Sequence, residues 1–455
     1  MDAPLTVAVV GSGPAGFYTA GALLDHEDLD VRVDMYERLA TPWGLVRAGV
    51  APDHPKIKSV SGVYAKIASE ESFRFFGNVH VGGSDGDITR EELAERYDAV
   101  VYTVGAQSDR KLGIPGEELP GCEAALDFVG WYNGHPDFAD RSFDMSSRRA
   151  VVIGAGNVAL DVARILCSPV SRLAKTDIAD HALEALAESS IEEVVVVGRR
   201  GPAQAAFTTP ELKELPEYTE SGVIVYPEDL PDAADDDALP RAVKRNVAIM
   251  REYAKGETPL GARHIALRFL RSPVELRGDG KVEEIVLGRN ELKVGDDGWV
   301  SAVDTGERET LEAGLVFRAV GYKGLSIPGL PYDERKGVIP NDNGRIEGTE
   351  REYVAGWIKR GPTGIIGTNK KCAVETVTQL LADLESGKLR RHDRDGTADV
   401  QQWLAQRQPH LVTEAGWQLI DAAERAAGEP HGRPRVKLTE RERLLDIALG
   451  RAAAV

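Results

Sequence analysis

Two glycine-rich segments carry the residue types that bind nucleotide phosphates. Gly11-Ser-Gly-Pro-Ala-Gly16 follows the apolar run Thr6–Val10, and Gly154-Ala-Gly-Asn-Val-Ala159 follows Ala150–Ile153. In such a segment the first glycine permits a tight turn, the second lets the backbone approach a pyrophosphate, and the third position lets the following helix pack on the strand. The N-terminus of that helix offers free N–H groups to the phosphates. We therefore predict two dinucleotide sites.

The residue at the end of the next strand distinguishes the two sites. In the first, the strand Val31–Tyr36 ends at Glu37, whose carboxylate can bind ribose hydroxyls and would repel a 2′-phosphate. FAD or NAD therefore suits this site better than NADP. In the second, Glu193–Val197 leads to Arg199 and Arg200, whose guanidinium groups can hold a 2′-phosphate. NADP(H) suits the second site, although two adjacent arginines can also be a solvated surface pair.

The elements that position these motifs are parallel strands alternating with helices, and the chain of 455 residues exceeds what one hydrophobic core usually organises. The expected fold class is α/β, with two nested Rossmann-like dinucleotide-binding domains. The buried-strand patterns at Ala99–Gly105 and Gly314–Gly321 indicate where the chain crosses between them. Residues 1–105 would begin an FAD-binding domain, 106–324 would form an inserted NADP-binding domain, and 325–455 would complete the first domain with C-terminal helices.

Charge and cysteine usage disfavour several classes of protein. The net charge of −18 argues against nucleic acid or an anionic membrane as a partner, so an acidic partner would need a local basic patch. Cys122, Cys167 and Cys372 form no CxxC pair, which argues against a disulfide framework, a zinc site and a dithiol relay. We expect all three to be buried, and we expect no metal site. Without a signal-like start or a long apolar run, the expected location is the cytoplasm.

Three segments make the interpretation more specific, namely Pro42–Pro55, Gly154–Arg164 and Gly356–Asn369. They resemble the adrenodoxin-reductase-type ferredoxin–NADP+ reductases, a branch of the two-dinucleotide-binding flavoproteins with the glutathione-reductase-like FAD/NAD(P) fold. Most members of the wider group have an aspartate after the late glycine, whereas this chain has Trp357, which matches the narrower branch. The resemblance spans roughly residues 5–385.

The resemblance implies that Trp357 and the backbone of Gly364–Ile366 contact the flavin. The glycine-rich loop there leads into a helix that we expect to begin near Thr368 or Asn369, and its N-terminus would stabilise negative charge on reduced flavin. A helix entry without a ligand is the alternative. The residues expected to bind FAD are Gly11, Gly13, Pro14, Ala15, Gly16, Glu37, Arg38, Gly44, Leu45, Val46, Gly105, Trp357, Gly364, Ile365 and Ile366.

The candidate catalytic residues are His54 and Glu211, which the resemblance places near the nicotinamide as modulators of cofactor geometry or proton balance. By themselves, His54 would be a surface or turn histidine and Glu211 an acid in the first turn of a helix. Hydride transfer itself needs no base on the protein. Asn157 either caps its helix or reaches the pyrophosphate. The residues expected to bind NADP(H) are Gly154, Gly156, Asn157, Val158, Ala159, Arg199, Arg200, Glu211 and Gly364.

The expected function is transfer of electrons from NADPH through FAD to a ferredoxin. An expected helix within Leu239–Lys255, after an exposed Asp/Ala loop at 232–238, groups Arg241, Lys244 and Arg245. The resemblance places ferredoxin-docking arginines in this region, whereas a solvated helix face is the alternative. Because fold alone does not set the acceptor, a flavin monooxygenase, an electron-feeding subunit or a diaphorase with another acceptor stays open. A nucleotide-sensing protein without turnover is the non-enzymatic alternative.

Overall fold

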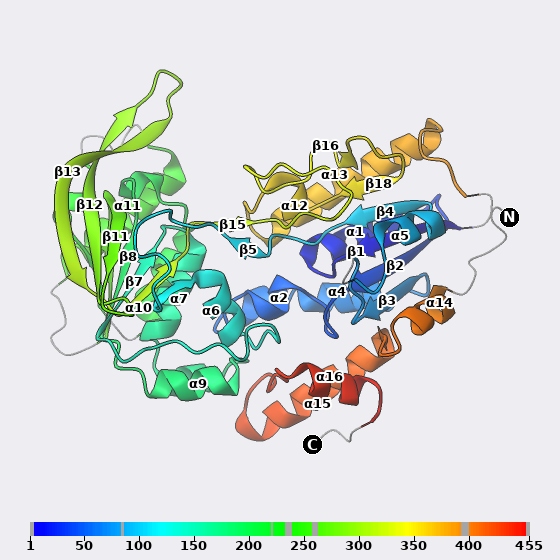
Figure 1. Cartoon of the computed structure of the whole chain (residues 1–455), viewed down its shortest axis with the longest axis horizontal. Coiled ribbons are helices and arrows are strands. Elements are labelled where there is room, and N and C mark those ends of the chain that lie inside the picture. Colours follow the sequence, from blue (N-terminus) through cyan, green and yellow to red (C-terminus); the bar gives the residue numbers. More distant parts are fainter. Residues whose placement is uncertain are drawn as a thin grey trace. The chain divides into compact units, whose positions relative to one another are not determined.

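The computed structural model describes residues 4–82, 86–219, 222–232, 239–256, 263–392 and 400–451. The chain divides into two compact units, of which the second, Asp109–Gly321, is one insertion between the two parts of the first, Met1–Ser108 and Tyr322–Val455. The blue and the orange-to-red segments of Figure 1 thus belong to one unit. No helix within the described ranges is long and apolar enough to span a bilayer.

An eight-stranded sheet forms the centre of the first unit, in the order β16-β17-β18-β4-β1-β2-β3-β19. The five strands from β18 to β3 run parallel, and the outer pairings are antiparallel. In the register of the central strands, Val7 pairs with Val33 on one side and with Ala99 on the other. The strands are β1 (Leu5–Val10), β2 (Val31–Glu37), β3 (Phe73–Gly77), β4 (Ala99–Tyr102), β16 (Asn341–Asp342), β17 (Arg345–Ile346), β18 (Glu352–Val354) and β19 (Val412–Thr413).

Helices from both parts of the first unit pack around this sheet. The helix α1 contacts α13, and α15 contacts β3, β19 and α16. One core cluster joins Val7 and Val9 to Trp417 and Leu444, so the C-terminal helices pack in the first unit. The helices are α1 (Pro14–Leu24), α2 (Leu45–Ala48), α3 (Pro55–Lys58), α4 (Ser61–Ala68), α5 (Arg90–Arg96), α12 (Trp357–Arg360), α13 (Ile366–Glu385), α14 (Val400–Arg407), α15 (Glu414–Gly428), η4 (Glu429–His431) and α16 (Arg441–Ala448).

The second unit has a six-stranded sheet in the order β6-β14-β7-β8-β10-β9, parallel throughout. Its central strand β8 is almost entirely valine and buried, which is typical of a parallel strand covered on both faces. The strands are β6 (Cys122–Ala124), β7 (Arg149–Ile153), β8 (Glu193–Val197), β9 (Gly222–Val225), β10 (His264–Arg268) and β14 (Leu315–Arg318), and the crossing segments contain β5 (Ser108–Asp109) and β15 (Tyr322–Lys323).

A separate antiparallel sheet belongs to the same unit, in which the long hairpin of β12 and β13 extends past β11 (Figure 1). Its strands are β11 (Arg271–Arg277), β12 (Glu284–Val294) and β13 (Val300–Glu312). The helices of the second unit are α6 (Ala125–Tyr132), α7 (Asn157–Cys167), α8 (Val170–Leu173), α9 (Asp180–Ala187), η1 (Pro202–Gln204), α10 (Thr209–Thr219), η2 (Pro227–Asp229) and α11 (Arg241–Tyr253).

The α/β class with parallel sheets is confirmed, and a few local predictions need correction. The strand predicted over Ala99–Gly105 ends at Tyr102. The helix expected near Thr368 begins at Ile366, because the Thr368 hydroxyl accepts a hydrogen bond from the Ile365 amide (3.2 Å) and so caps the first turn. Of the predicted loop at 232–238, all but the first residue lies outside the described residues.

Candidate functional site

The first glycine segment forms the turn between β1 and α1. Gly11 has φ +105°, and Gly13 is the N-cap of α1, so Pro14 and Ala15 open the helix. A Cβ on Gly16 would lie 2.1 Å from the carbonyl oxygen of Gly11, so only glycine permits this contact between helix and turn. A Cβ on Gly13 would meet no atom within 4 Å, which leaves its backbone open to an approaching phosphate.

Glu37 is held beside this turn at the carboxyl end of β2. Its Oε2 accepts hydrogen bonds from the Ser12 hydroxyl (2.6 Å) and the Ser12 amide (3.2 Å), and its Oε1 accepts one from the Leu39 amide (3.0 Å). The carboxylate therefore has the place and charge suited to ribose hydroxyls. Arg38, the next residue, is half-buried.

Two further segments of the first unit reach the same turn. Gly44, with φ +50°, is the N-cap of α2, and a Cβ on it would lie 2.8 Å from the Cα of Gly13. A Cβ on Gly356 would lie 2.6 Å from the Cβ of Ala15. The tertiary structure thus brings the segments that begin α2 and α12 against the glycine turn, as the proposed FAD set requires.

Trp357, the first residue of α12, has a buried indole nitrogen with no hydrogen-bond acceptor in the part of the chain that the structure describes. Buried donors are normally paired, so an unpaired one indicates a ligand atom. Gly364 (φ +79°) and the exposed Ile365 precede the N-terminus of α13, while Gly105 (φ +74°) follows β4. The open backbone at Gly13, the carboxylate of Glu37 and the unpaired indole fit a flavin dinucleotide.

The second glycine segment forms the corresponding turn between β7 and α7. Gly154 has φ +143°, and a Cβ on it would lie 2.3 Å from the carbonyl oxygen of Ala319. Gly156 is the N-cap of α7, so of the two alternatives for Asn157 the one in which it caps the helix is wrong. The side-chain amide oxygen of Asn157 instead accepts a hydrogen bond from the backbone amide of Thr208 (2.8 Å). This bond joins the glycine turn to the segment before α10. Val158 and Ala159 lie in the first turn of α7, and Ala159 is fully buried.

Arg199 and Arg200 directly follow Gly198 at the end of β8, with Arg199 exposed and Arg200 half-buried. The guanidinium of Arg200 lies over the ring of Trp299, 5.1 Å from its centroid. Neither arginine forms an ion pair with a carboxylate within the described ranges. In a chain with a net charge of −18, two adjacent arginines without carboxylate partners favour an anionic ligand.

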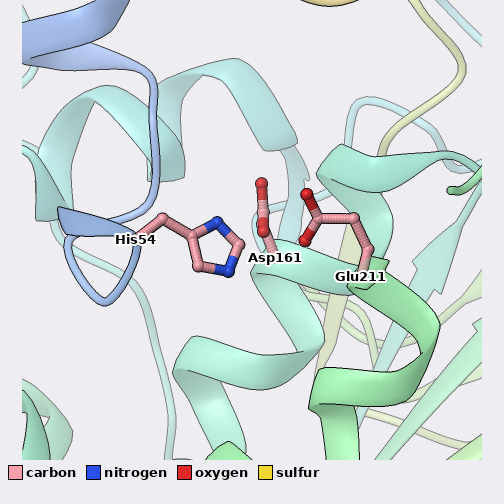
Figure 2. Close-up of side chains that lie close together, drawn as sticks. All are labelled: His54, Asp161 and Glu211. Carbon is pink, nitrogen blue, oxygen red and sulfur yellow. The ribbon is translucent and has the colours of Figure 1, made fainter. Parts of the chain in front are cut away.

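A charge cluster of Asp161, Arg164 and Glu211 joins α7 to α10 in the second unit, and Figure 2 shows its two carboxylates. Arg164 is fully buried and donates to Asp161 (2.7 Å), and its other terminal nitrogen lies 3.7 Å from a Glu211 oxygen. Carboxylate oxygens of Asp161 and Glu211 lie within 4.8 Å of each other, so the arginine offsets a repulsion between them. Asp161 and Arg164 are not among the residues predicted for the site, although a pair of opposite charges three residues apart on the helix after the second glycine segment could have indicated them.

His54 belongs to the first unit, where it is the N-cap residue of the short helix α3. Its side chain is 7% exposed, and it follows a turn at residues 52–53. Its carbonyl oxygen accepts hydrogen bonds from the amides of Ile57 (3.1 Å) and Lys58 (3.2 Å). The other proposed catalytic residue, Glu211, belongs to the second unit.

Comparisons with known proteins place the chain in a family. The profile described as pyridine nucleotide-disulphide oxidoreductase matches residues 5–228. The chain is 57% identical to the NADPH-ferredoxin reductase FprA of Mycobacterium tuberculosis, over 98% of this chain and 100% of that protein. It is 44% identical to the mitochondrial NADPH:adrenodoxin oxidoreductase of Salvelinus fontinalis, over 97% of this chain and 91% of that protein. The chain belongs to the adrenodoxin-reductase-type ferredoxin–NADP+ reductases.

This reductase also matches a solved structure of M. tuberculosis FprA in complex with NADPH. The TM-score is 0.95 at 57% identity, and the match covers 98% of this chain and 100% of that chain. The three cysteines of the reductase are free and buried, as predicted. Burial raises the pKa of the Cys167 thiol to about 12, so this thiol stays protonated at neutral pH.

Proposed function

We propose that this protein is an NADPH-dependent flavoprotein reductase that passes electrons from NADPH through FAD to a ferredoxin. The observation that carries the proposal is the contrast between two similar glycine turns, each of which follows a parallel strand of its own sheet. The first turn lies beside the carboxylate of Glu37, whereas β8 is followed by Arg199 and Arg200, which pair with no carboxylate among the described residues. The same chain therefore offers one site for an unmodified ribose and one for a ribose 2′-phosphate.

In the proposed FAD site, Gly11–Gly16 and the N-terminus of α1 bind the pyrophosphate, and Glu37 binds the adenosine ribose. The segments Gly44–Val46 and Gly364–Ile366, together with Gly105, Arg38 and Trp357, complete the site. The unpaired indole N–H of Trp357 would donate a hydrogen bond to the cofactor. When bound, FAD accepts a hydride from NADPH and releases its electrons singly to a one-electron acceptor.

In the proposed NADP site, Gly154–Ala159 and the N-terminus of α7 bind the pyrophosphate. Arg199 and Arg200 bind the 2′-phosphate through charge-assisted hydrogen bonds, while Gly364 completes the set. Glu211 and His54 adjust the geometry or the proton balance at the nicotinamide. The ion-pair arrangement with Arg164 supports this role for Glu211, because it holds the carboxylate at the start of α10.

The proposed docking surface for ferredoxin is the basic patch of Arg241, Lys244 and Arg245 on α11. All three side chains are exposed, whereas Asn246, Val247 and Met250 form the buried face of the same helix. Two nearby cations are engaged locally, because Arg251 donates to the Pro231 carbonyl and Lys255 pairs with Glu252. The patch would steer an acidic partner against the overall negative charge of the chain.

The decisive experiment mixes the purified protein with NADPH and an acidic iron–sulfur ferredoxin, and follows reduction of cytochrome c by the ferredoxin. We expect bound FAD after purification, bleaching of the flavin by NADPH, and cytochrome c reduction that depends on ferredoxin. A protein that retains no flavin contradicts the FAD assignment. Reduction of ferricyanide without transfer to any ferredoxin contradicts the acceptor. The cytoplasmic location stays a prediction.

A further inference from the structure

The loop of Arg199 and Arg200 is held by the antiparallel sheet of the second unit. Three consecutive carbonyl groups, from Gly198 to Arg200, accept hydrogen bonds from this sheet or the residue before it. Gly198 accepts from the Arg271 amide (3.1 Å), and Arg200 accepts from the Leu270 amide (3.1 Å). The Arg199 carbonyl accepts from the side-chain amide of Asn290 on β12 (2.8 Å). The backbone of the proposed 2′-phosphate loop is thus fixed by residues outside the parallel sheet.

The same hairpin also reaches a side chain of this loop through Trp299. Trp299 lies in the turn between β12 and β13, where its amide donates to Asp297 (2.9 Å) and its carbonyl accepts from Gly295 (2.9 Å). The indole is 61% exposed, so its place is not explained by burial in a core. The guanidinium of Arg200 lies over the indole ring of Trp299 in a cation–π contact, 5.1 Å from the ring centroid.

The contact with Trp299 is compatible with phosphate binding by the same guanidinium. A cation–π contact places the guanidinium over the ring face, and the group has five N–H donors with which it can also bind a phosphate. The edge of Arg200 forms no ion pair with any carboxylate of the described residues. The cation–π contact with Trp299 therefore restricts the motion of Arg200 without pairing its charge with a carboxylate.

We propose that Trp299 determines specificity for NADPH by holding Arg200 in the position that binds the 2′-phosphate. Trp299 is a positioning residue, since it acts on the substrate through Arg200. The inference rests on the proposed 2′-phosphate site and adds a residue that the glycine motif does not contain. It predicts an effect on binding of the 2′-phosphate and none on hydride transfer.

The test compares Trp299→Ala and Trp299→Phe with the wild-type holoenzyme. An exposed cation–π contact corresponds to a change of about two- to fivefold in binding, so W299A should raise the KM for NADPH by that factor. The turnover number with ferricyanide and the KM for NADH should stay at wild-type values. W299F should restore most of the loss, because phenylalanine keeps an aromatic face.

A binding measurement without turnover provides the second readout. Calorimetric titration with adenosine 2′-monophosphate should show the same two- to fivefold weakening in W299A, whereas adenosine 5′-monophosphate should bind both proteins equally. The matched control is Val294→Ala, at an exposed position of the same hairpin, which should leave every value unchanged. Circular dichroism and the flavin spectrum should show that each variant is folded.

The variant Arg200→Ala tests the proposed 2′-phosphate site independently of the role of Trp299. We expect R200A to weaken NADPH binding, and W299A to add nothing in the R200A background. If R200A weakens NADPH binding and W299A behaves like wild type, the role of Trp299 is overturned and the proposed 2′-phosphate site stands. An R200A enzyme with undiminished preference for NADPH overturns the site itself, and this inference with it. Equal losses with NADPH and NADH in W299A would show a purely structural role.

Discussion

The two nucleotide sites of this reductase differ in the charge of single side chains at the ends of two strands. Glu37 is the last residue of β2 and Arg199 lies two residues after β8, so the carboxyl ends of equivalent strands carry opposite charges. A carboxylate repels a 2′-phosphate, whereas a guanidinium binds it with two donors. The choice of cofactor therefore depends on the charge of a few side chains in a backbone arrangement that both sites share.

The variant with both Arg199 and Arg200 changed to Ala should lose its preference for NADPH. Charge-assisted hydrogen bonds contribute about 1.5–3 kcal/mol each, so loss of two should raise the KM for NADPH by about 100-fold or more. The KM for NADH should change little, as measured by ferricyanide reduction. Arg277→Ala, which removes an exposed arginine elsewhere in the second unit, is the control. A similar loss with both nucleotides would mean that the arginines support the fold.

At the scale of elements, the C-terminal helix α15 holds the segment that begins α2. Glu424 of α15 is fully buried and accepts hydrogen bonds from Arg47 at 2.8 and 2.5 Å and from Arg435 at 3.0 Å. Arg47 belongs to α2, whose first residues, Leu45 and Val46, are in the proposed FAD site. Burial alone would raise the pKa of Glu424, but the charges of Arg47 and Arg435 hold this pKa below its ordinary value.

We expect Glu424→Gln to reduce the free energy of unfolding by about 3–5 kcal/mol, because it leaves the buried guanidinium of Arg47 without a counter-charge, while Arg435 keeps its ion pair with Asp421. The lowered pKa of Glu424 stabilises the fold above its unfolded value of 4.5, and this contribution is lost as the pH falls through the folded pKa. The difference between wild type and E424Q should thus shrink below about pH 4.5. Denaturant unfolding at several pH values measures it, with Glu429→Gln at an exposed position as the control. Equal stability at pH 7 would contradict the argument.

The helix α11 leads to a prediction about the partner. Reversing Arg241 and Arg245 to Glu should slow ferredoxin-coupled reduction of cytochrome c about tenfold or more at low salt, because steering raises association rates by such factors. The rate should also depend less on ionic strength, while ferricyanide turnover stays near wild type. The variant with Arg148 and Arg277 changed to Glu carries the same change of charge on other elements of the second unit. If it slows the reaction equally, net charge and not the patch decides docking.

At the scale of the whole molecule, the second unit is a continuous insertion with a complete sheet and its own cores. All six strands of its parallel sheet and every residue of two core clusters lie within residues 109–321. The first unit instead needs both of its parts, because β18 pairs with β4 at the centre of its sheet. Only the inserted unit can therefore fold from one continuous piece of the chain.

A fragment of residues 109–321 should accordingly fold by itself and bind adenosine 2′-monophosphate, but not FAD. Cooperative thermal unfolding by circular dichroism and calorimetric titration would test both parts. Its affinity should lie within about threefold of the full chain, since the proposed 2′-phosphate loop and the hairpin that braces it are both in the fragment. A fragment without a cooperative transition would show that the second unit depends on the first.

The sequence by itself determined the two glycine turns, the strands β2 and β8 that follow them, and the charges at their ends. These features are readable because they depend on spacing within one βαβ unit, where residues close in sequence are also close in space. The α/β class and the buried cysteines followed from similar local patterns. The family resemblance supplied the late segment at Trp357, which no local periodicity indicates.

Only the tertiary structure decided which distant residues meet. It joins Arg47 to Glu424 across 377 positions, sets Gly356 against Ala15, and places Trp299 under Arg200. It also buries Arg164 between two carboxylates of neighbouring helices. Such contacts follow from how helices and hairpins pack, and packing depends on the shape of the whole core, which a pattern of neighbouring residues does not contain.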